Sequence, residues 1–196
     1  MAGILVVCTG NICRSPMAAG FLRAALERRF GALAPDVRSA GTLARRGEPA
    51  SVGAVFAAAE LGVDLSAHRA VPLTAGLVRE ADVVLAMAAE HREAVARLAP
   101  GAEAVTFTLK ELVRRLEALP PAGGLAPGAL RARLAEATVG LDPGRGGSDD
   151  DVPDPLGGTL DGYVAVAREL RSLAERFVTA TWGAGIPGSV GAEAAG

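Results

Sequence analysis

Four short runs of apolar residues recur along the first half of the chain, and stretches with helical periodicity separate them. Runs of this length, bounded by turn residues, are typical of strands that lie buried in a parallel sheet. The predicted strands are Ile4–Val7, Val37–Ala40, Asp82–Met87 and Ala104–Phe107. The predicted helices are 15–30, 51–61, 88–98, Lys110–Leu119 and Leu160–Thr181.

Alternating strands and helices predict an α/β fold with right-handed crossovers between parallel strands. We therefore expect a single doubly wound domain over residues 1–182, with a four-stranded parallel sheet flanked by helices on both faces. Ligands of such folds bind beyond the carboxyl ends of the strands. Candidate chemistry is therefore sought in the loops that follow the strands.

Two regions depart from this alternation. Glycine and proline flank the segment 120–151, which we predict to be a flexible surface insertion with a short helix at 128–137. The last residues, 183–196, are small and rich in glycine, so we expect a disordered tail.

Composition narrows the classes of function. A chain of 196 residues can bury a sizeable core, and with 4% aromatic residues that core consists mainly of Ala, Leu and Val. A net charge of -2 argues against a general nucleic-acid binder. No stretch reaches the roughly 20 apolar residues that span a bilayer, and we expect the apolar start Met1–Val7 not to be a signal peptide, because it is too short and lacks a basic leader. We expect a cytoplasmic protein with neither nucleic-acid nor membrane partners.

The cysteine and histidine content is also informative. The two cysteines, Cys8 and Cys13, are too close together for a secreted disulfide framework. The two histidines, His68 and His91, show no spacing to cysteine that predicts a metal site. We therefore expect no metal and no cofactor.

The loop between the first strand and the first helix carries the strongest chemical signal. Its residues are Cys8, Thr9, Gly10, Asn11, Ile12, Cys13, Arg14, Ser15 and Pro16. Loop amides and the positive end of the helix converge there on one point, which suits a tetrahedral oxyanion. The same field favours a thiolate at Cys8. One short loop can thus hold a phosphoryl group and attack it, unless the cysteine merely packs in the core.

This segment resembles the signature loop of the low-molecular-weight protein tyrosine phosphatases. The resemblance implies a phosphotyrosine phosphatase I-like fold and hydrolysis of a phosphorylated protein or small phosphomonoester through a phosphocysteine on Cys8. It also implies that residues 9–13 surround the phosphate and that Arg14 grips two of its oxygens with a planar guanidinium. Ser15 resembles the serine that stabilises the sulfur as leaving group, although a helix cap is the alternative.

A second matching segment supplies an acid. Residues 152–158, Val-Pro-Asp-Pro-Leu-Gly-Gly, resemble the acid loop of the family. The resemblance implies that Asp154 protonates the leaving oxygen and then deprotonates the attacking water. Asp142 also precedes a proline, but it lacks the Gly-Gly and the helix that follow Asp154.

Three further residues match positions that brace the cysteine loop in the family. Asn11 is suited to a left-handed backbone, Ser39 follows the second strand, and His68 lies in Ser-Ala-His-Arg-Ala. The resemblance implies that Asn11, Ser39 and His68 form a hydrogen-bond network with Ser15. His68 is otherwise an ordinary polar residue near a core, and His91 receives no role.

The predicted substrate pocket departs from the family pattern. Leu156 stands where relatives commonly place an aromatic residue, and Arg45 lies in a second stretch that often carries one. Aromatic walls stack on phenyl phosphates, so a preference for phosphotyrosine stays open.

Three alternatives remain beside the tyrosine phosphatase. Thioredoxin-coupled arsenate reductases of the same fold need further cysteines, and none follows Cys13. Protein-arginine phosphatases resemble this loop but carry threonine at the position of Ile12. A non-catalytic phosphate-binding module would need no Asp154.

Overall fold

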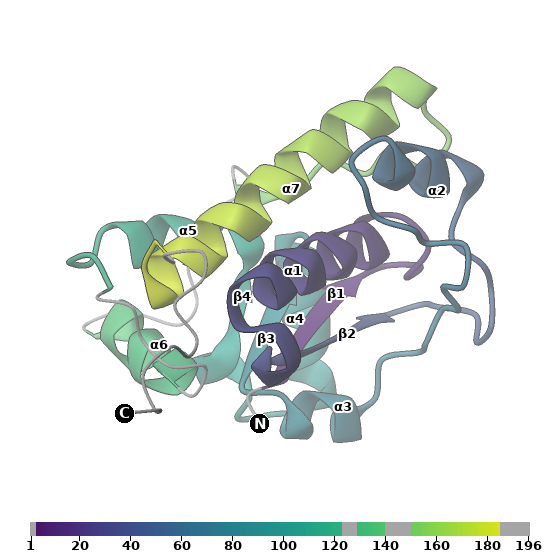
Figure 1. Ribbon diagram of the computed structural model, residues 1–196. Helices are drawn as coiled ribbons and strands as arrows, with labels where there is room; N and C mark the ends of the chain where they lie inside the picture. Colours follow the sequence, from purple (N-terminus) through teal and green to yellow (C-terminus); the bar gives the residue numbers. More distant parts are fainter. Residues whose placement is uncertain (1–2, 123–128, 140–149, 185–196) are drawn as a thin grey trace.

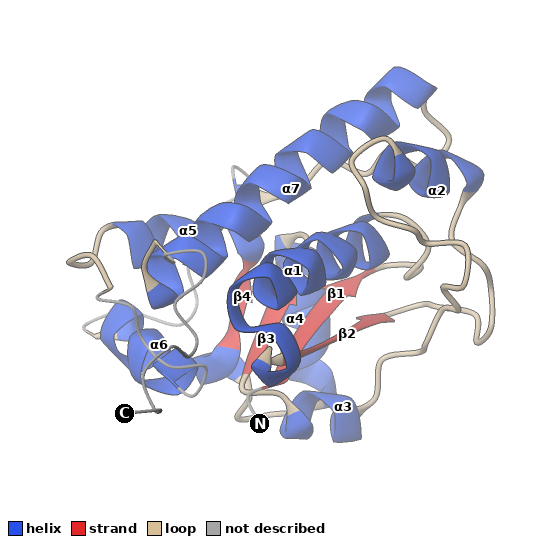
Figure 2. Ribbon diagram, in the orientation of Figure 1, coloured by secondary structure: helices blue, strands red, loops and turns tan. Residues whose placement is uncertain are grey.

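The computed structural model describes residues 3–122, 129–139 and 150–184. Its strands are β1 (Gly3–Cys8), β2 (Asp36–Gly41), β3 (Val83–Ala86) and β4 (Thr106–Thr108). They form one parallel sheet in the order β2-β1-β3-β4 (Figure 2). The predicted four-stranded parallel sheet is therefore confirmed.

The ends of all four strands differ from the prediction: β1 and β2 are each one residue longer at both ends, β3 is one residue shorter at both ends, and β4 begins and ends later. Asp82 lies just before β3, where its carboxylate accepts a 2.7 Å hydrogen bond from the Gly3 N–H. The fourth strand begins later than expected because Glu103–Val105 forms a 3₁₀ turn. Asp82 is buried without joining the sheet, whereas Ala104 is exposed and Val105 is half-buried in the 3₁₀ turn. A short apolar run therefore does not by itself determine where a strand begins.

The predicted helices are present, together with one that the sequence pattern did not reveal. The α-helices are α1 (Arg14–Phe30), α2 (Val52–Ala59), α3 (Ala75–Glu80), α4 (Ala89–Leu98), α5 (Leu109–Glu117), α6 (Leu130–Thr138) and α7 (Leu160–Trp182), and a 3₁₀ turn spans Gly31–Leu33. The unpredicted helix, α3, has six residues, which is too short to show helical periodicity. Its start is nevertheless capped, since the Thr74 hydroxyl accepts from the Leu77 N–H.

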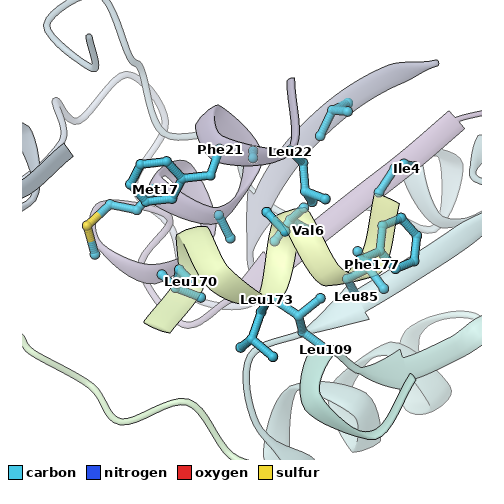
Figure 3. Close-up of a cluster of buried hydrophobic side chains, with 14 of the residues drawn as sticks. Ile4, Val6, Met17, Phe21, Leu22, Leu85, Leu109, Leu170, Leu173 and Phe177 are labelled. Atoms are coloured by element: carbon cyan, nitrogen blue, oxygen red, sulfur yellow. The ribbon is translucent and has the colours of Figure 1, made fainter. Parts of the chain in front are cut away.

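Helices cover both faces of the sheet, as expected for a doubly wound fold (Figure 1). Alternate residues of β1 point to opposite faces: Ile4 and Val6 belong to the larger core, and Leu5 and Val7 to the smaller one. The larger core contains α1, α5 and α7, and its centre is drawn in Figure 3. The smaller core lies against α3 and α4.

The segment 120–151 is only partly described, and its helix is not a surface excursion. Three apolar residues of α6, namely Leu130, Leu134 and Ala137, are buried in the larger core. Their spacing of four and three residues places them on one helix face, which packs toward α5 and α7. Residues 123–128 and 140–149 and the tail from 185 lie outside the described residues, so flexibility there stays a prediction.

The carboxyl ends of β1, β2 and β3 meet at one edge of the sheet. There the Thr42 N–H donates to the Cys8 carbonyl at 2.9 Å, and the Val152 N–H donates to the Met87 carbonyl at 2.8 Å. The first bond brings the segment after β2 beside the end of β1, and the second brings the segment before α7 beside the end of β3. In the part of the chain that is described, no helix is long and apolar enough to cross a membrane.

Candidate active site

Cys8 ends β1 with its sulfur facing two hydrogen-bond donors. The Asn11 N–H donates to Cys8 Sγ at 3.3 Å, and Ser15 Oγ lies 3.0 Å from the same sulfur. Ser15 has one hydroxyl proton, and the competing acceptor, the Ala40 carbonyl, is farther away at 3.4 Å. The N-cap of α1 is Cys13, which leaves the Ser15 hydroxyl free to face the sulfur. This arrangement stabilises negative charge on Cys8.

Asn11 holds the cysteine loop, residues 8–15, in shape. It is the one described non-glycine residue with a positive φ, 54°, a conformation that asparagine tolerates better than most residues. Its Nδ2 donates to the hydroxyls of Ser15 and Ser39, both at 2.9 Å. Its Oδ1 accepts from the Val71 N–H at 2.8 Å. One fully buried side chain thus ties the loop to β2 and to the segment between α2 and α3.

His68 supports the same residue through the backbone. Its Nε2 lies 2.7 Å from the Asn11 carbonyl oxygen. Because a carbonyl only accepts, Nε2 must carry the proton in this contact. Burial lowers the pKa of His68, against the opposing effect of that carbonyl. His68 is therefore neutral, with its proton on Nε2, at neutral pH.

The backbone after β2 approaches the cysteine loop too closely for a side chain. A Cβ on Gly41 would lie 2.6 Å from the Thr9 carbonyl oxygen and 2.8 Å from the Asn11 nitrogen. Only glycine fits at this position. The close approach allows the Leu43 N–H to donate to the Thr9 carbonyl at 2.9 Å.

Arg14 brings the cysteine loop and the acid loop, residues 152–158, into contact. Its side chain is 6% exposed, and its Nη2 lies 2.5 Å from Asp154 Oδ2. Its Nη1 donates to the Val152 carbonyl at 3.3 Å. The Asp154 side chain is 42% exposed, so its carboxylate lies at the mouth of the site. The competing Asp142 lies outside the described residues.

The acid loop is fixed at its base. Besides the bond from Val152 to the Met87 carbonyl, Asp151 Oδ1 accepts from the Ala89 N–H at 2.8 Å, at the start of α4. The Leu156 N–H donates to Asp154 Oδ1 at 3.1 Å and orients the carboxylate. Base and tip are thus held by different contacts.

His91, for which no role was predicted, lies against the cysteine loop. Its side chain is 1% exposed, and its Nε2 is 2.9 Å from Thr9 Oγ1. Arg14 Nη2 donates to the same hydroxyl at 3.3 Å. Burial, followed by the positive charge of Arg14, lowers the pKa of His91. The available signal was positional, because His91 lies in the first turn of the helix after β3, at the same edge of the sheet as Cys8.

The second cysteine, Cys13, contacts side chains at the starts of α2 and α7. Cys13 Sγ lies 3.1 Å from Ser51 Oγ and 3.8 Å from the Tyr163 hydroxyl, on the side of α2 and α7. Burial raises the pKa of the Cys13 thiol. The sulfur of Cys13 is therefore held as a neutral thiol inside the core.

The remaining predicted residues lie around the loop and at its rim. Gly10 is half-buried, and Ile12 is half-buried against the larger core. Arg45 and Leu156 are exposed, and the backbone N–H of Leu156 donates to Asp154 Oδ1. The structure therefore groups Cys8, Arg14 and Asp154 with the bracing residues, and the role of Arg45 and Leu156 in a substrate pocket stays a prediction.

The geometry suits covalent transfer of a tetrahedral group. A stabilised sulfur, a helix N-terminus and a guanidinium surround one point, and a carboxylate lies at its mouth. Across the three described stretches, no three His, Cys, Asp or Glu side chains gather into a possible metal site.

Comparison with known proteins gives a consistent result. Residues 3–119 match the model of the family described as low molecular weight phosphotyrosine protein phosphatase. A protein-arginine-phosphatase of Geobacillus stearothermophilus is 34% identical over 89% of this chain and 92% of its own length. A probable low molecular weight protein-tyrosine-phosphatase of Ralstonia solanacearum, EpsP, is 43% identical over 56% of this chain and 71% of its own.

A solved structure agrees over nearly the whole chain. It is a variant of the YwlE arginine phosphatase whose active-site serine is phosphorylated. It superposes with a TM-score of 0.69 at 33% identity and covers 90% of this chain and 93% of that one.

Proposed function

Because the chain belongs to the low molecular weight phosphotyrosine protein phosphatase family, we propose that Cys8, Arg14 and Asp154 carry out its phosphatase reaction. The observation that supports this assignment most directly is the 2.5 Å contact between Arg14 and Asp154, which are 140 residues apart in the chain. That contact places an acid loop directly beside a loop built around a stabilised sulfur. The structure of a relative with a phosphorylated active-site serine supports a covalent phosphoenzyme.

In the first step the sulfur of Cys8 attacks phosphorus. The S–P bond forms, the P–O bond to the leaving group breaks, and Asp154 donates its proton to the departing oxygen. Arg14 and the loop amides bind the other phosphate oxygens. Since a phosphate oxyanion takes the place of Asp154 on the guanidinium, substrate binding frees the carboxylate, which takes up a proton from the substrate monoanion or from solvent and then acts as the acid.

In the second step water attacks phosphorus and Asp154 takes its proton. The S–P bond breaks, and the electron pair returns to Cys8 as a thiolate. The Asn11 N–H and the Ser15 hydroxyl then stabilise that thiolate at 3.3 and 3.0 Å. The net reaction consumes one phosphomonoester and one water, and it releases an alcohol and phosphate.

His91 and Thr9 assist by fixing the guanidinium. The Thr9 hydroxyl contacts both His91 and Arg14, so it links α4 to the loop that binds phosphate. We assign Thr9 and His91 the task of holding Arg14 in position.

The test is hydrolysis of p-nitrophenyl phosphate by the wild type and by Cys8→Ser. Loss of a triad residue lowers kcat on the order of 10⁴- to 10⁶-fold in a serine protease that works through a covalent intermediate. We expect a loss of that size, with an unchanged melting temperature and no effect of a chelator on the wild type. Activity retained by Cys8→Ser would reject the covalent mechanism.

The substrate is a phosphorylated protein or another phosphoester, and we propose phosphotyrosine as the phosphorylated residue. Ile12 is half-buried and apolar, so it offers no acceptor to the guanidinium of a phosphoarginine. Phosphoarginine is the second candidate, because a relative named as a protein-arginine-phosphatase matches 89% of the chain.

Two peptides of one sequence, carrying either phosphotyrosine or phosphoarginine, distinguish these candidates. We expect the wild type to have the higher kcat/KM for the phosphotyrosyl peptide. Ile12→Thr adds a hydroxyl and should shift the ratio toward phosphoarginine. A wild type that prefers the phosphoarginyl peptide would establish the second candidate instead.

A further inference from the structure

A groove of about 550 Å³ opens beside the cysteine loop, on the side of α4. Thr9 of the cysteine loop and His91, which contacts it, belong to the lining. Leu43, Leu73 and Leu98 supply apolar lining from three separate segments of the chain, and Glu90 and Arg97 of α4 supply charged lining. The reaction proposed above uses only Thr9 and His91 of this groove.

The groove and the cysteine loop are continuous. Thr9 lines the groove and also follows Cys8 directly in the loop. The Leu43 N–H donates to the Thr9 carbonyl, and His91 Nε2 contacts the Thr9 hydroxyl at 2.9 Å. The backbone of Thr9 therefore holds the wall that contains Leu43, and the side chain of Thr9 holds the wall that contains His91. Both walls are thereby fixed relative to the cysteine loop.

Two leucines of the groove are largely exposed. The side chain of Leu43 is 77% exposed and that of Leu98 is 41% exposed. Apolar surface that lines a concave site gains free energy when a ligand covers it. A small phosphomonoester held by the cysteine loop ends close to Cys8 and leaves both leucines uncovered.

A polypeptide substrate reaches farther. An extended chain advances about 3.3–3.6 Å per residue, so residues one to three positions from the phosphorylated residue extend beyond Thr9. An apolar side chain among them has the chemistry to cover Leu43 and Leu98. The continuity with the phosphate site favours this occupant over an unrelated small ligand.

From this geometry we infer that the groove is a subsite for an apolar side chain close in sequence to the phosphorylated residue. The enzyme then selects phosphorylated polypeptides by their sequence as well as by their phosphate. This inference rests on the proposed function, because it requires the phosphate to be bound by the cysteine loop.

The experiment compares phosphopeptides that carry leucine or glycine at each position from three before to three after the phosphorylated residue. Phosphotyrosyl and phosphoarginyl sets are both assayed, with p-nitrophenyl phosphate as a substrate without flanking residues. For the wild type we expect leucine at one position to raise kcat/KM about tenfold over glycine. Equal rates for leucine and glycine at every position would overturn the inference, as would hydrolysis of p-nitrophenyl phosphate but of no peptide.

Variants then locate the preference in the groove. Leu98→Asp and Leu43→Asp should each abolish the leucine preference and leave kcat/KM for p-nitrophenyl phosphate within about twofold of the wild type. Leu33→Asp is the matched control, since Leu33 is 71% exposed and precedes β2 at the opposite end of the sheet. It should retain the preference.

Failure of the subsite inference and failure of the proposed function give different results. The subsite inference is overturned if the preference for leucine survives both groove variants, or if Leu33→Asp also removes it. In either case the hydrolysis of p-nitrophenyl phosphate continues. If Leu98→Asp does not fold, Leu43→Asp alone tests the subsite, because Leu43 lies in an exposed loop where the substitution does not disturb the core. A wild type without activity on p-nitrophenyl phosphate would instead reject the proposed function itself.

Discussion

The cysteine loop and the acid loop meet at Arg14, yet they are built in opposite ways. Asn11 and Ser15 in the cysteine loop are fully buried, and a network of side-chain hydrogen bonds holds them. Asp154 in the acid loop has a side chain that is 42% exposed, and Leu156 beside it is 57% exposed. The acid loop is anchored at its base, whereas its tip extends to the surface.

This difference matches the two tasks. A tetrahedral oxyanion has a fixed geometry, so donors that are already in place stabilise it without reorganisation. A leaving group varies from one substrate to the next, and product must depart past the acid. A carboxylate on an exposed tip can adjust to both needs. Disruption of the cysteine loop should therefore affect every substrate, and disruption of the acid loop should affect substrates unequally.

The largest expected effect in this comparison comes from Asp154→Ala. Loss of a general acid lowers kcat by about 10²- to 10⁴-fold where the leaving group needs a proton. We expect a loss of that size with an alkyl phosphate and a much smaller one with p-nitrophenyl phosphate, whose leaving group is already stable as an anion. A plot of log kcat against leaving-group pKa measures the difference.

Asp161→Ala is the control for this variant, because Asp161 is an exposed carboxylate in the first turn of α7. It should leave the leaving-group dependence unchanged. An equal loss on all substrates in Asp154→Ala would mean that Asp154 shapes the phosphate site instead of carrying a proton.

An intermediate effect is expected from Ser39→Ala, which alters the bracing without touching substrate. It leaves one Asn11 Nδ2 proton without its 2.9 Å acceptor, and an unsatisfied buried donor costs about 1–3 kcal/mol. Part of that cost should appear as a fall in kcat/KM of about tenfold, similar for alkyl and nitrophenyl substrates. Ser66→Ala removes an exposed hydroxyl that contacts Asp64, and it should change kcat/KM by less than about twofold. Equal effects of the two variants would contradict the bracing role.

The smallest effect concerns pH and the free energy of unfolding. In the unfolded chain His91 takes up a proton near pH 6.5, whereas burial and Arg14 keep it neutral in the fold. As the pH falls below about 6.5 the unfolded state binds the extra proton, so the folded protein loses stability. One such group contributes at most about 1.4 kcal/mol per pH unit.

Urea denaturation at about pH 7 and about pH 5 measures this loss. His91→Gln lacks the titrating group and should lose less stability on acidification than the wild type. An equal or larger loss in the variant would show that His91 does not keep its neutral form in the fold.

Features that depend on residues close together in the sequence were predicted well, and features that depend on contacts between distant residues were not. Strands such as β1 and helices such as α1 are marked by local periodicity, and the family relationship rests on one contiguous segment. The contact of His91 with Thr9 joins positions 82 residues apart, and it depends on β3 lying next to β1. No local pattern contains that information.

The errors have similarly physical causes. The short helix α3 has too few residues for a periodic signal, and the prolines and glycines around α6 obscured the apolar face that Leu130 and Leu134 bury. The assignment of Arg45 and Leu156 to the substrate pocket stays a prediction, because exposed side chains like these are not fixed by packing and their contacts are not specified by the sequence.

The most direct test of the account is to trap the phosphoenzyme. Wild-type protein is mixed with p-nitrophenyl phosphate, denatured within the first turnover and digested, and the peptide around Cys8 is analysed by mass spectrometry with fragmentation. We predict one phosphoryl group on the sulfur of Cys8, formed with a burst of nitrophenol of matching size. A phosphoryl group on Cys13 or on another residue, or turnover without any covalent adduct, would contradict the central claim.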